Sequence, residues 1–241
     1  MEIRKVVDRM SIEEILDVYY SQDAKFVIHK IIAFNKAFSK CLSSSRTKRF
    51  TFNLEEYKRK DGLNIVIQCF DMGSSFPTGK RLKIQSYFWF IYRGGLYAIR
   101  LLPEKDNSSL LYLYTPHFID RYKERGLRDV SISKSDALNK FIYANHKIVG
   151  KRIQSEKYPN NFWLCYEEGI AFVEPRFFRK GNIQFSELTM KTFISWDSLS
   201  LKRRNISLSI FQESISKGLD IKIPDEILDE NNTMNSNNIP N

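Results

Sequence analysis

The feature that most constrains the fold is a change of hydrophobic period near residue 45. Within the segment 23–42 apolar side chains recur at helical spacing, whereas from residue 50 onward they alternate with polar ones. The alternating stretches are separated by turn signals, of which Asp61-Gly62 and Gly94-Gly95 are typical of hairpins. Helices followed by several strands, without regular strand–helix alternation, predict an α+β protein with antiparallel sheets.

Capping signals mark two N-terminal helices. Ser11 and Glu14 form a capping box for a helix that runs to about Tyr20. Asp23 is placed to cap a second helix that runs to about Leu42. We therefore expect two helices before the first strand.

The second half of the sequence predicts a helix-then-sheet unit. Thr115 is expected to cap a helix with Pro116 in its first turn, and Gly126 is expected to end it. Ser133 and Asp136 form a further capping box. The later expected elements are two strands within 162–173 around Glu168-Gly169, a strand over 190–196, a basic turn over 201–204 that Asp197 caps, and a helix over 208–217.

Three regions follow from this order. We expect an N-terminal helix-plus-sheet region over residues 1–107 and a C-terminal region over residues 108–228. Residues 229–241 are dominated by Asn, Ser and acidic side chains, which cannot supply a core. We expect this tail to be disordered.

The charge balance favours a polyanionic partner. The chain of 241 residues has 38 Lys and Arg against 28 Asp and Glu, a formal net charge of +10. Its longest apolar runs, such as 88–92, are far shorter than the ~20 residues that span a bilayer, and no signal peptide is visible. We therefore expect RNA or another nucleic acid as partner, and no membrane.

The cysteines and histidines argue against a metal or a disulfide framework. Cys41, Cys69 and Cys165 are far apart, odd in number and flanked by apolar residues, which predicts buried thiols and a cytoplasmic setting. His29 lies in an apolar helical segment and is interpreted as a core or boundary residue. His146 is interpreted as a helix-terminal residue, with a second proton-transfer group as the alternative. No metal motif and no Walker or Rossmann glycine pattern occurs, so we expect neither metal nor cofactor.

One polar constellation carries chemistry. On a helix that starts at Thr115, the side chains of His117, Arg121 and Glu124 fall on one face, with Arg125 at its edge. An imidazole can exchange a proton with a ribose hydroxyl near neutral pH, and guanidinium groups bind phosphate oxygens. The same pattern also occurs on solvated helix faces, where Arg121 would pair with a nearby carboxylate.

The stretch Thr115 to Leu127, with the sequence TPHFIDRYKERGL, resembles the T-x-H-x-x-x-R-x-x-E-R-G opening of small toxin-like domains. Those domains are grouped with the RelE and barnase–EndoU–colicin ribonuclease superfold. Residues 162–173 look like their aromatic-rich hairpin, and residues 190–194 look like their last strand. The similarity covers about residues 110–196; the chain is far longer, and segment 174–188 intrudes before the last strand.

The resemblance implies roles for four residues. It implies His117 as general acid/base, Arg121 and Arg125 as phosphate contacts, and Thr192 as a supporting hydroxyl. Further basic segments are interleaved with aromatic residues, which suits stacking on unpaired bases. The expected nucleic-acid contacts are Arg176, Arg179, Lys180, Lys202, Arg203 and Arg204, with further basic pairs at 48–49, 58–60 and 80–81.

Three hypotheses follow. The first is a metal-independent, toxin-like endoribonuclease with a His/Arg site and a neutralising protein partner. The second is a non-catalytic module that binds nucleic acid or ribonucleoprotein with the same cations. The third is a host-interaction protein without an active site.

Overall fold

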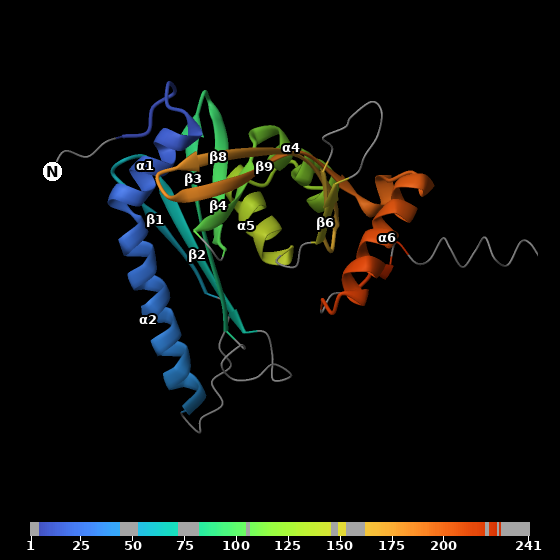
Figure 1. Cartoon of the computed structure of the whole chain (residues 1–241), viewed down its shortest axis with the longest axis horizontal. Coiled ribbons are helices and arrows are strands. Elements are labelled where there is room, and N and C mark those ends of the chain that lie inside the picture. The colour runs from blue at the N-terminus through green and yellow to red at the C-terminus, as the bar shows by residue number, and fades with distance from the viewer. Residues whose placement is uncertain are drawn as a thin grey trace, which may run out of the picture. The chain divides into compact units, whose positions relative to one another are not determined.

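The computed structural model of the chain (Figure 1) describes residues 5–43, 53–71, 82–104, 107–145, 149–152, 162–219, 222–225 and 227. Its backbone contacts divide the chain into two units. Unit 1 comprises Met1–Leu111 with Arg179–Phe185, and unit 2 comprises Tyr112–Phe178 with Ser186–Asn241. The division thus falls after Leu111, whereas the sequence predicted a boundary after residue 107. In addition, the later segment Arg179–Phe185 belongs to unit 1.

Two helices open unit 1. The capping box predicted for Ser11 and Glu14 is confirmed at the start of α1 (Ile12–Gln22), where each side chain accepts from the other residue's backbone N–H. The second helix, α2 (Ala24–Ser43), packs against strands β2 and β3 described below. Figure 1 shows α2 lying alongside these strands.

Asp23 joins the two helices in an unexpected way. Its carbonyl accepts from Val27 N at 3.0 Å, but its carboxylate turns inward and is fully buried. Oδ1 of Asp23 accepts from Arg59 Nε at 2.5 Å. The side-chain cap predicted for Asp23 is therefore wrong, because the carboxylate is used to bind Arg59.

The strands of unit 1 form an antiparallel sheet. They are β1 (Asn53–Lys58), β2 (Asn64–Asp71), β3 (Leu82–Tyr92), β4 (Gly95–Pro103) and the first residues of β5 (Ser108–Tyr114), in the order β1-β2-β3-β4-β5. The hairpin predicted at Asp61-Gly62 joins β1 to β2. In the next hairpin Tyr92 pairs with Gly95, so Arg93 and Gly94 form the turn, both with positive φ. The turn therefore lies one residue earlier than Gly94-Gly95.

The core of unit 1 lies between its helices and its sheet. Tyr19 of α1 stacks on Phe88 of β3 with ring centroids 4.6 Å apart. Every residue from Ile65 to Cys69 of β2 is buried, so both faces of this strand are covered. On one of these faces Gln85 donates to Gln68 at 2.9 Å, which satisfies a polar pair in the interior.

Unit 1 also contains the tip of a later hairpin. Lys180 pairs with Asp17 at 2.6 Å, and Phe185 contacts Tyr20 with ring centroids 6.5 Å apart. Gln184 N donates to Asn107 O at 2.9 Å. The segment 174–188, which interrupts the resemblance, is thus the extended end of β8 and β9, whose bounds follow.

Unit 2 begins with three helical segments. They are α4 (Pro116–Tyr122), the π-helix η1 (Lys123–Leu127) and α5 (Lys134–Ala144), whose predicted cap Ser133 accepts from Asp136 N. Strands β6 (Val149–Arg152), β7 (Phe162–Cys165), β8 (Gly169–Lys180) and β9 (Ile183–Ser195) follow, in the order β9-β8-β7-β6. The short η2 (Trp196–Ser198) and α6 (Leu201–Ser216) come last.

Residues of β9 face two different cores. Phe193 packs edge-to-face against Phe118 and Tyr122 of α4. The next residue, Ile194, belongs to a cluster with Ile210 and Phe211 of α6. Because successive side chains of a strand point to opposite faces, α4 and α6 cover opposite faces of this sheet.

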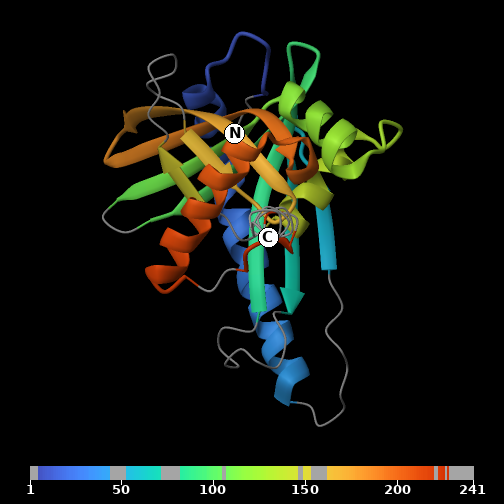
Figure 2. The ribbon, with the colours of Figure 1, turned by 90° about the vertical axis from the view of Figure 1, so that its right-hand side faces the viewer.

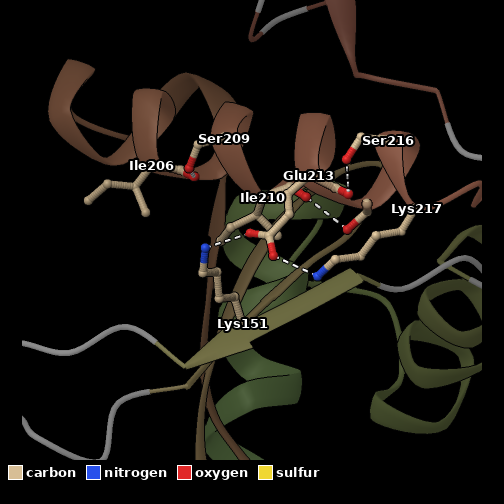
Figure 3. Close-up of polar contacts among 8 residues, drawn as sticks. Lys151, Ile206, Ser209, Ile210, Glu213, Ser216 and Lys217 are labelled. Atoms are coloured by element: carbon tan, nitrogen blue, oxygen red, sulfur yellow. Dashed lines mark hydrogen bonds and ion pairs between the residues drawn. The ribbon is translucent and has the colours of Figure 1, made fainter.

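Helix α6 is continuous from Leu201, whereas the sequence predicted a separate turn over 201–204 before a helix at 208. The helix packs against β6 and β7 (Figure 2). Glu213 binds two lysines, Lys151 of β6 at 2.5 Å and Lys217 at 2.6 Å (Figure 3). These two hydrogen bonds lower the pKa of Glu213 to about 2. The ion pairs lie beside the buried Ile210, which supplies the apolar part of the same contact.

The α+β prediction is confirmed, with antiparallel pairings and N-terminal helices before the sheet. No helix in the described part of the chain is long and apolar enough to cross a membrane. The predicted tail 229–241, the basic pairs 48–49 and 80–81, and His146 lie outside the described residues. The interpretation of His29 as a core residue is wrong, because its side chain is exposed on α2.

Candidate functional site

The motif that carries the resemblance begins with Thr115, whose hydroxyl makes two hydrogen bonds. Thr115 Oγ1 accepts from Phe118 N at 3.2 Å, which confirms the predicted cap, and the same hydroxyl donates to Met190 O of β9 at 2.8 Å. Pro116 occupies the first helical position as predicted. The start of α4 is thereby held to β9.

The other end of the motif is a wide turn. Residues 123–127 form a π-helix, and Arg128 follows it in the left-handed conformation at φ 53°. The predicted stop at Gly126 is therefore wrong by two residues. Glycine is required there for packing, since a Cβ on Gly126 would lie 2.5 Å from two ring carbons of Tyr122.

The two arginines predicted to contact phosphate have protein partners. Arg121 Nη1 pairs with Glu124 Oε2 at 2.6 Å, and both side chains are about two-fifths exposed. Arg125 Nη1 donates to Phe193 O of β9 at 3.1 Å. Arg125 therefore tethers η1 to the sheet, while Arg121 belongs to an accessible ion pair.

His117 differs from its neighbours in the motif. It is exposed on α4, and its imidazole makes no hydrogen bond or ion pair with another residue in the described ranges. Its backbone is fixed by the Thr115 and Arg125 bonds at either end of the helical segment. The imidazole is thus exposed to solvent on a helix that is held to β9 by hydrogen bonds.

Thr192 does not join this group. It lies on β9 beside Phe193, which contacts α4, and two residues before Ile194 on the other face. Strand alternation places Thr192 on the face of Ile194, away from α4. Of the four residues that the resemblance implied, the described geometry brings together His117 and Arg121 on the exposed face of one helix.

A partly buried polar network binds the last residue of α4, and sequence reasoning missed it. Glu168 Oε2 accepts from the Tyr122 hydroxyl and from Asn145 Nδ2, both at 2.7 Å. Burial, and then the charge of Glu168, raises the pKa of Tyr122. Gly169 follows Glu168, and a Cβ on it would lie 2.3 Å from Ile194 O, so the backbones touch at this turn.

A cationic cluster, here called the Asp197 cluster, lies elsewhere in unit 2 and comprises Arg128, Asp197, Lys202, Arg203 and Arg204. Arg128 forms an ion pair with the Asp197 carboxylate. Arg204 Nη2 donates to Asp197 O at 3.3 Å, and Arg203 lies over the Phe172 ring at 5.5 Å. A hydrogen bond from Ser195 and then Arg128 lower the pKa of Asp197. Within the cluster, Arg128 binds the Asp197 carboxylate and Arg204 binds the Asp197 carbonyl, while Lys202 and Arg203 are exposed on the adjoining turn of α6.

The other predicted nucleic-acid contacts are more fully compensated. Arg176 binds Glu187 at 2.9 Å and covers the Phe178 ring at 4.9 Å. Lys180 pairs with Asp17, whereas Arg179 is exposed. The predicted contacts thus form two groups. Arg176, Arg179 and Lys180 lie on β8, and Lys202, Arg203 and Arg204 follow one another at the start of α6.

The remaining reactive groups are buried or dispersed. Burial raises the pKa of both Cys69 and Cys165 to about 12, which confirms buried thiols at these two positions. The described ranges contain no group of three His, Cys, Asp or Glu side chains arranged to hold a metal. No family model, no curated protein and no solved structure matches the chain.

Proposed function

We propose that the chain is a cytoplasmic protein that binds RNA or another nucleic acid through the Asp197 cluster. The observation that supports the proposal is that Arg128 and Arg204 both bind Asp197, which lies shortly before the exposed Lys202 and Arg203 in unit 2. Guanidinium and ammonium groups neutralise backbone phosphates and release condensed counterions, which supplies most sequence-independent affinity. The formal net charge of +10 acts in the same direction at longer range.

The local chemistry of the cluster suits phosphate contacts. Lys202 and Arg203 are exposed in the first turn of α6. That turn contains no acidic residue. Arg128 is 71% exposed although it is paired, so its remaining N–H groups are accessible to a second acceptor. Because ion pairs at the surface contribute only ~0–1 kcal/mol to stability, Arg128 can exchange Asp197 for a phosphate oxygen at little cost.

Binding is tested with fluorescein-labelled single-stranded RNA, single-stranded DNA and duplex DNA, measured by anisotropy over a range of salt concentrations. Lys202→Ala combined with Arg203→Ala is expected to weaken binding about tenfold or more and to reduce the salt slope by about two. The matched control is Lys217→Ala with Lys222→Ala, two lysines at the far end of α6 and beyond it. Equal loss in both double variants, or no binding by the wild type, would refute the proposal.

A second proposal is metal-independent RNA cleavage at His117, and it is supported by the exposure of that imidazole on an anchored helix. The imidazole would remove the proton from a ribose 2′-hydroxyl, and Arg121 would exchange Glu124 for a phosphate oxygen. A toxin-like role and a neutralising partner depend on this activity. The described geometry assigns no second proton-transfer group, so the binding function has the stronger support.

Cleavage is tested by incubating the purified chain with RNA in EDTA. We expect His117→Ala to abolish any cleavage and His29→Ala, which changes an exposed histidine in unit 1, to leave it unchanged. Cleavage that persists in His117→Ala would point to a contaminating nuclease. Binding without cleavage would leave only the first proposal.

A further inference from the structure

Helix α2 of unit 1 has a chemically distinctive outer face. Its sequence, AKFVIHKIIAFNKAFSKCLS, contains four lysines and one histidine and no acidic residue. Ile28 is 55% exposed and Ile32 is 46% exposed, one helical turn apart. The helix therefore presents apolar and basic side chains on the side that is turned away from β2 and β3.

Helical geometry places these side chains in one stripe. At 100° per residue, Ile28 and Ile32 lie next to one another, and Lys25, His29 and Lys36 follow directly beside them. All five are exposed. The inner face is formed instead by Val27 and Phe38, which are buried. We call the exposed stripe of Ile28, Ile32, Lys25, His29 and Lys36 the α2 face.

Within the described residues, Lys25 and Lys36 of the α2 face form no ion pair. Lys30 lies elsewhere on the helix, over the Tyr57 ring at 4.6 Å. The two adjacent exposed isoleucines offer a small apolar contact, and the lysines beside them favour an acidic partner.

We infer that the α2 face docks an acidic amphipathic helix of a partner protein. Leucine-like side chains of such a helix would cover Ile28 and Ile32, and its flanking carboxylates would meet Lys25 and Lys36. This is the helix-on-helix mode in which apolar anchors set the contact and charges set its orientation. The inference stands on unit 1 and is independent of the nucleic-acid proposal for unit 2.

Charge and composition disfavour the other occupants. A second copy would place one basic α2 face against another, and like charges would repel. A lipid surface is usually bound by a broad apolar face with aromatic residues, whereas the α2 face has two isoleucines. RNA would be stacked by exposed aromatics, but Phe26 packs edge-to-face on Tyr57 at 4.9 Å and Phe38 is buried.

The probe is a synthetic, fluorescein-labelled peptide of about 18 residues with leucines at helical spacing and glutamates on the flanks. The control peptide has the same composition, with its leucines scattered around the helix. Binding to the full chain is measured by anisotropy. We expect the amphipathic peptide to bind and the scattered peptide to bind about tenfold more weakly, because charge alone is then retained.

Two double variants separate the apolar and the charged contributions. Ile28→Ser with Ile32→Ser, and Lys25→Glu with Lys36→Glu, are each expected to weaken the peptide about tenfold or more. The matched controls are Val130→Ser, an exposed valine of unit 2, and Lys217→Glu with Lys222→Glu. Thermal unfolding verifies that each variant is folded, which is expected because the changed residues are exposed.

Three results would overturn the inference. The first is equal binding of the two peptides, and the second is undiminished binding by the α2 variants. The third is binding to phosphatidylserine vesicles or to single-stranded RNA that is lost in both α2 variants while the peptide does not bind. The variants that test RNA binding lie on α6, whereas those that test peptide binding lie on α2. Failure of the RNA proposal would therefore leave the peptide result unaffected.

Discussion

Asp23 of unit 1 is fully buried and Glu168 of unit 2 is half-buried, and the two carboxyl groups are satisfied by different chemistry. In unit 1 the buried Asp23 binds the guanidinium of Arg59 and interacts electrostatically with Asp61, which is also buried. In unit 2 Glu168 accepts from a phenol and a carboxamide, both neutral donors. Burial, together with Asp61, raises the pKa of Asp23 to about 6.

This difference teaches where each unit responds to its surroundings. A pair of carboxyls beside one cation holds its charge with difficulty, so its contribution to stability depends on pH. An acceptor of two neutral hydrogen bonds fixes geometry instead, and here Glu168 fixes Tyr122, the last residue of the helix that carries His117. Unit 1 is therefore expected to respond to protons, and unit 2 to the loss of a contact.

The largest effect is expected for Gly169→Ala in unit 2. The new Cβ would lie 2.3 Å from Ile194 O and 2.7 Å from Phe193 Cζ, and a backbone carbonyl cannot move away cheaply. We expect a loss of about 3 kcal/mol in the free energy of unfolding, measured by urea denaturation. Gly218→Ala is the control, because its Cβ would meet nothing within 4 Å at a similarly unusual backbone position. An equal loss in the control would show that the close approach is unimportant.

Glu168→Ala is expected to cost about 2 kcal/mol, since it leaves the buried Tyr122 hydroxyl without an acceptor and leaves Asn145 Nδ2 with only the Phe141 carbonyl. Adding Tyr122→Phe should cost less in this background than in the wild type, because the hydroxyl is then already unpaired. A double-mutant cycle on unfolding free energies measures this coupling. Additive effects would contradict the network.

The pH response of unit 1 is expected to be smaller. The folded-state pKa of Asp23 lies above its ordinary value of 3.8, so its protonated form favours folding. This contribution is complete below about pH 4 and is lost as the pH rises through about 6, a change of about 1–2 kcal/mol. The stability difference between the wild type and Asp23→Asn should follow this window in unfolding experiments. A difference that is constant from pH 4 to 7 would show that Asp23 is ionised throughout.

The smallest effect is expected at Glu213. It joins Lys151 and Lys217 on the surface, and such exposed pairs contribute little. Glu213→Gln should leave the Tm unchanged within error at high salt and lower it slightly at low salt. A large loss would mean that these pairs hold α6 more firmly than the buried Ile210 does.

Local signals in the sequence predicted much of the fold. Ser11, Thr115 and Ser133 cap helices where the pattern placed them, because each cap depends on residues three positions apart. The side chain of Asp23 departed from this rule because Arg59, thirty-six residues away, competes for it. Capping can be read locally, whereas burial of a charge depends on a distant partner.

The candidate site was only partly predictable for the same reason. The pattern placed His117 and Arg121 on one exposed face, as the structure does. It could not show that Arg125 reaches Phe193 O or that Thr192 shares the face of Ile194, since both depend on how β9 lies against α4. Much of the motif that the resemblance emphasised secures the helix, and this leaves His117 as its accessible member.

The wide turn of η1 makes chain length itself part of this arrangement. A π-turn holds one residue more than an α-turn, so removal of Lys123 would let the helix continue regularly. The residues inside the turn would then rotate about the axis, so the Arg125 guanidinium would swing away from the Phe193 carbonyl, while the residues after the turn would keep their positions. A variant one residue shorter would retain every side chain named in the motif and still lose one of the two hydrogen bonds that hold the helical segment to β9.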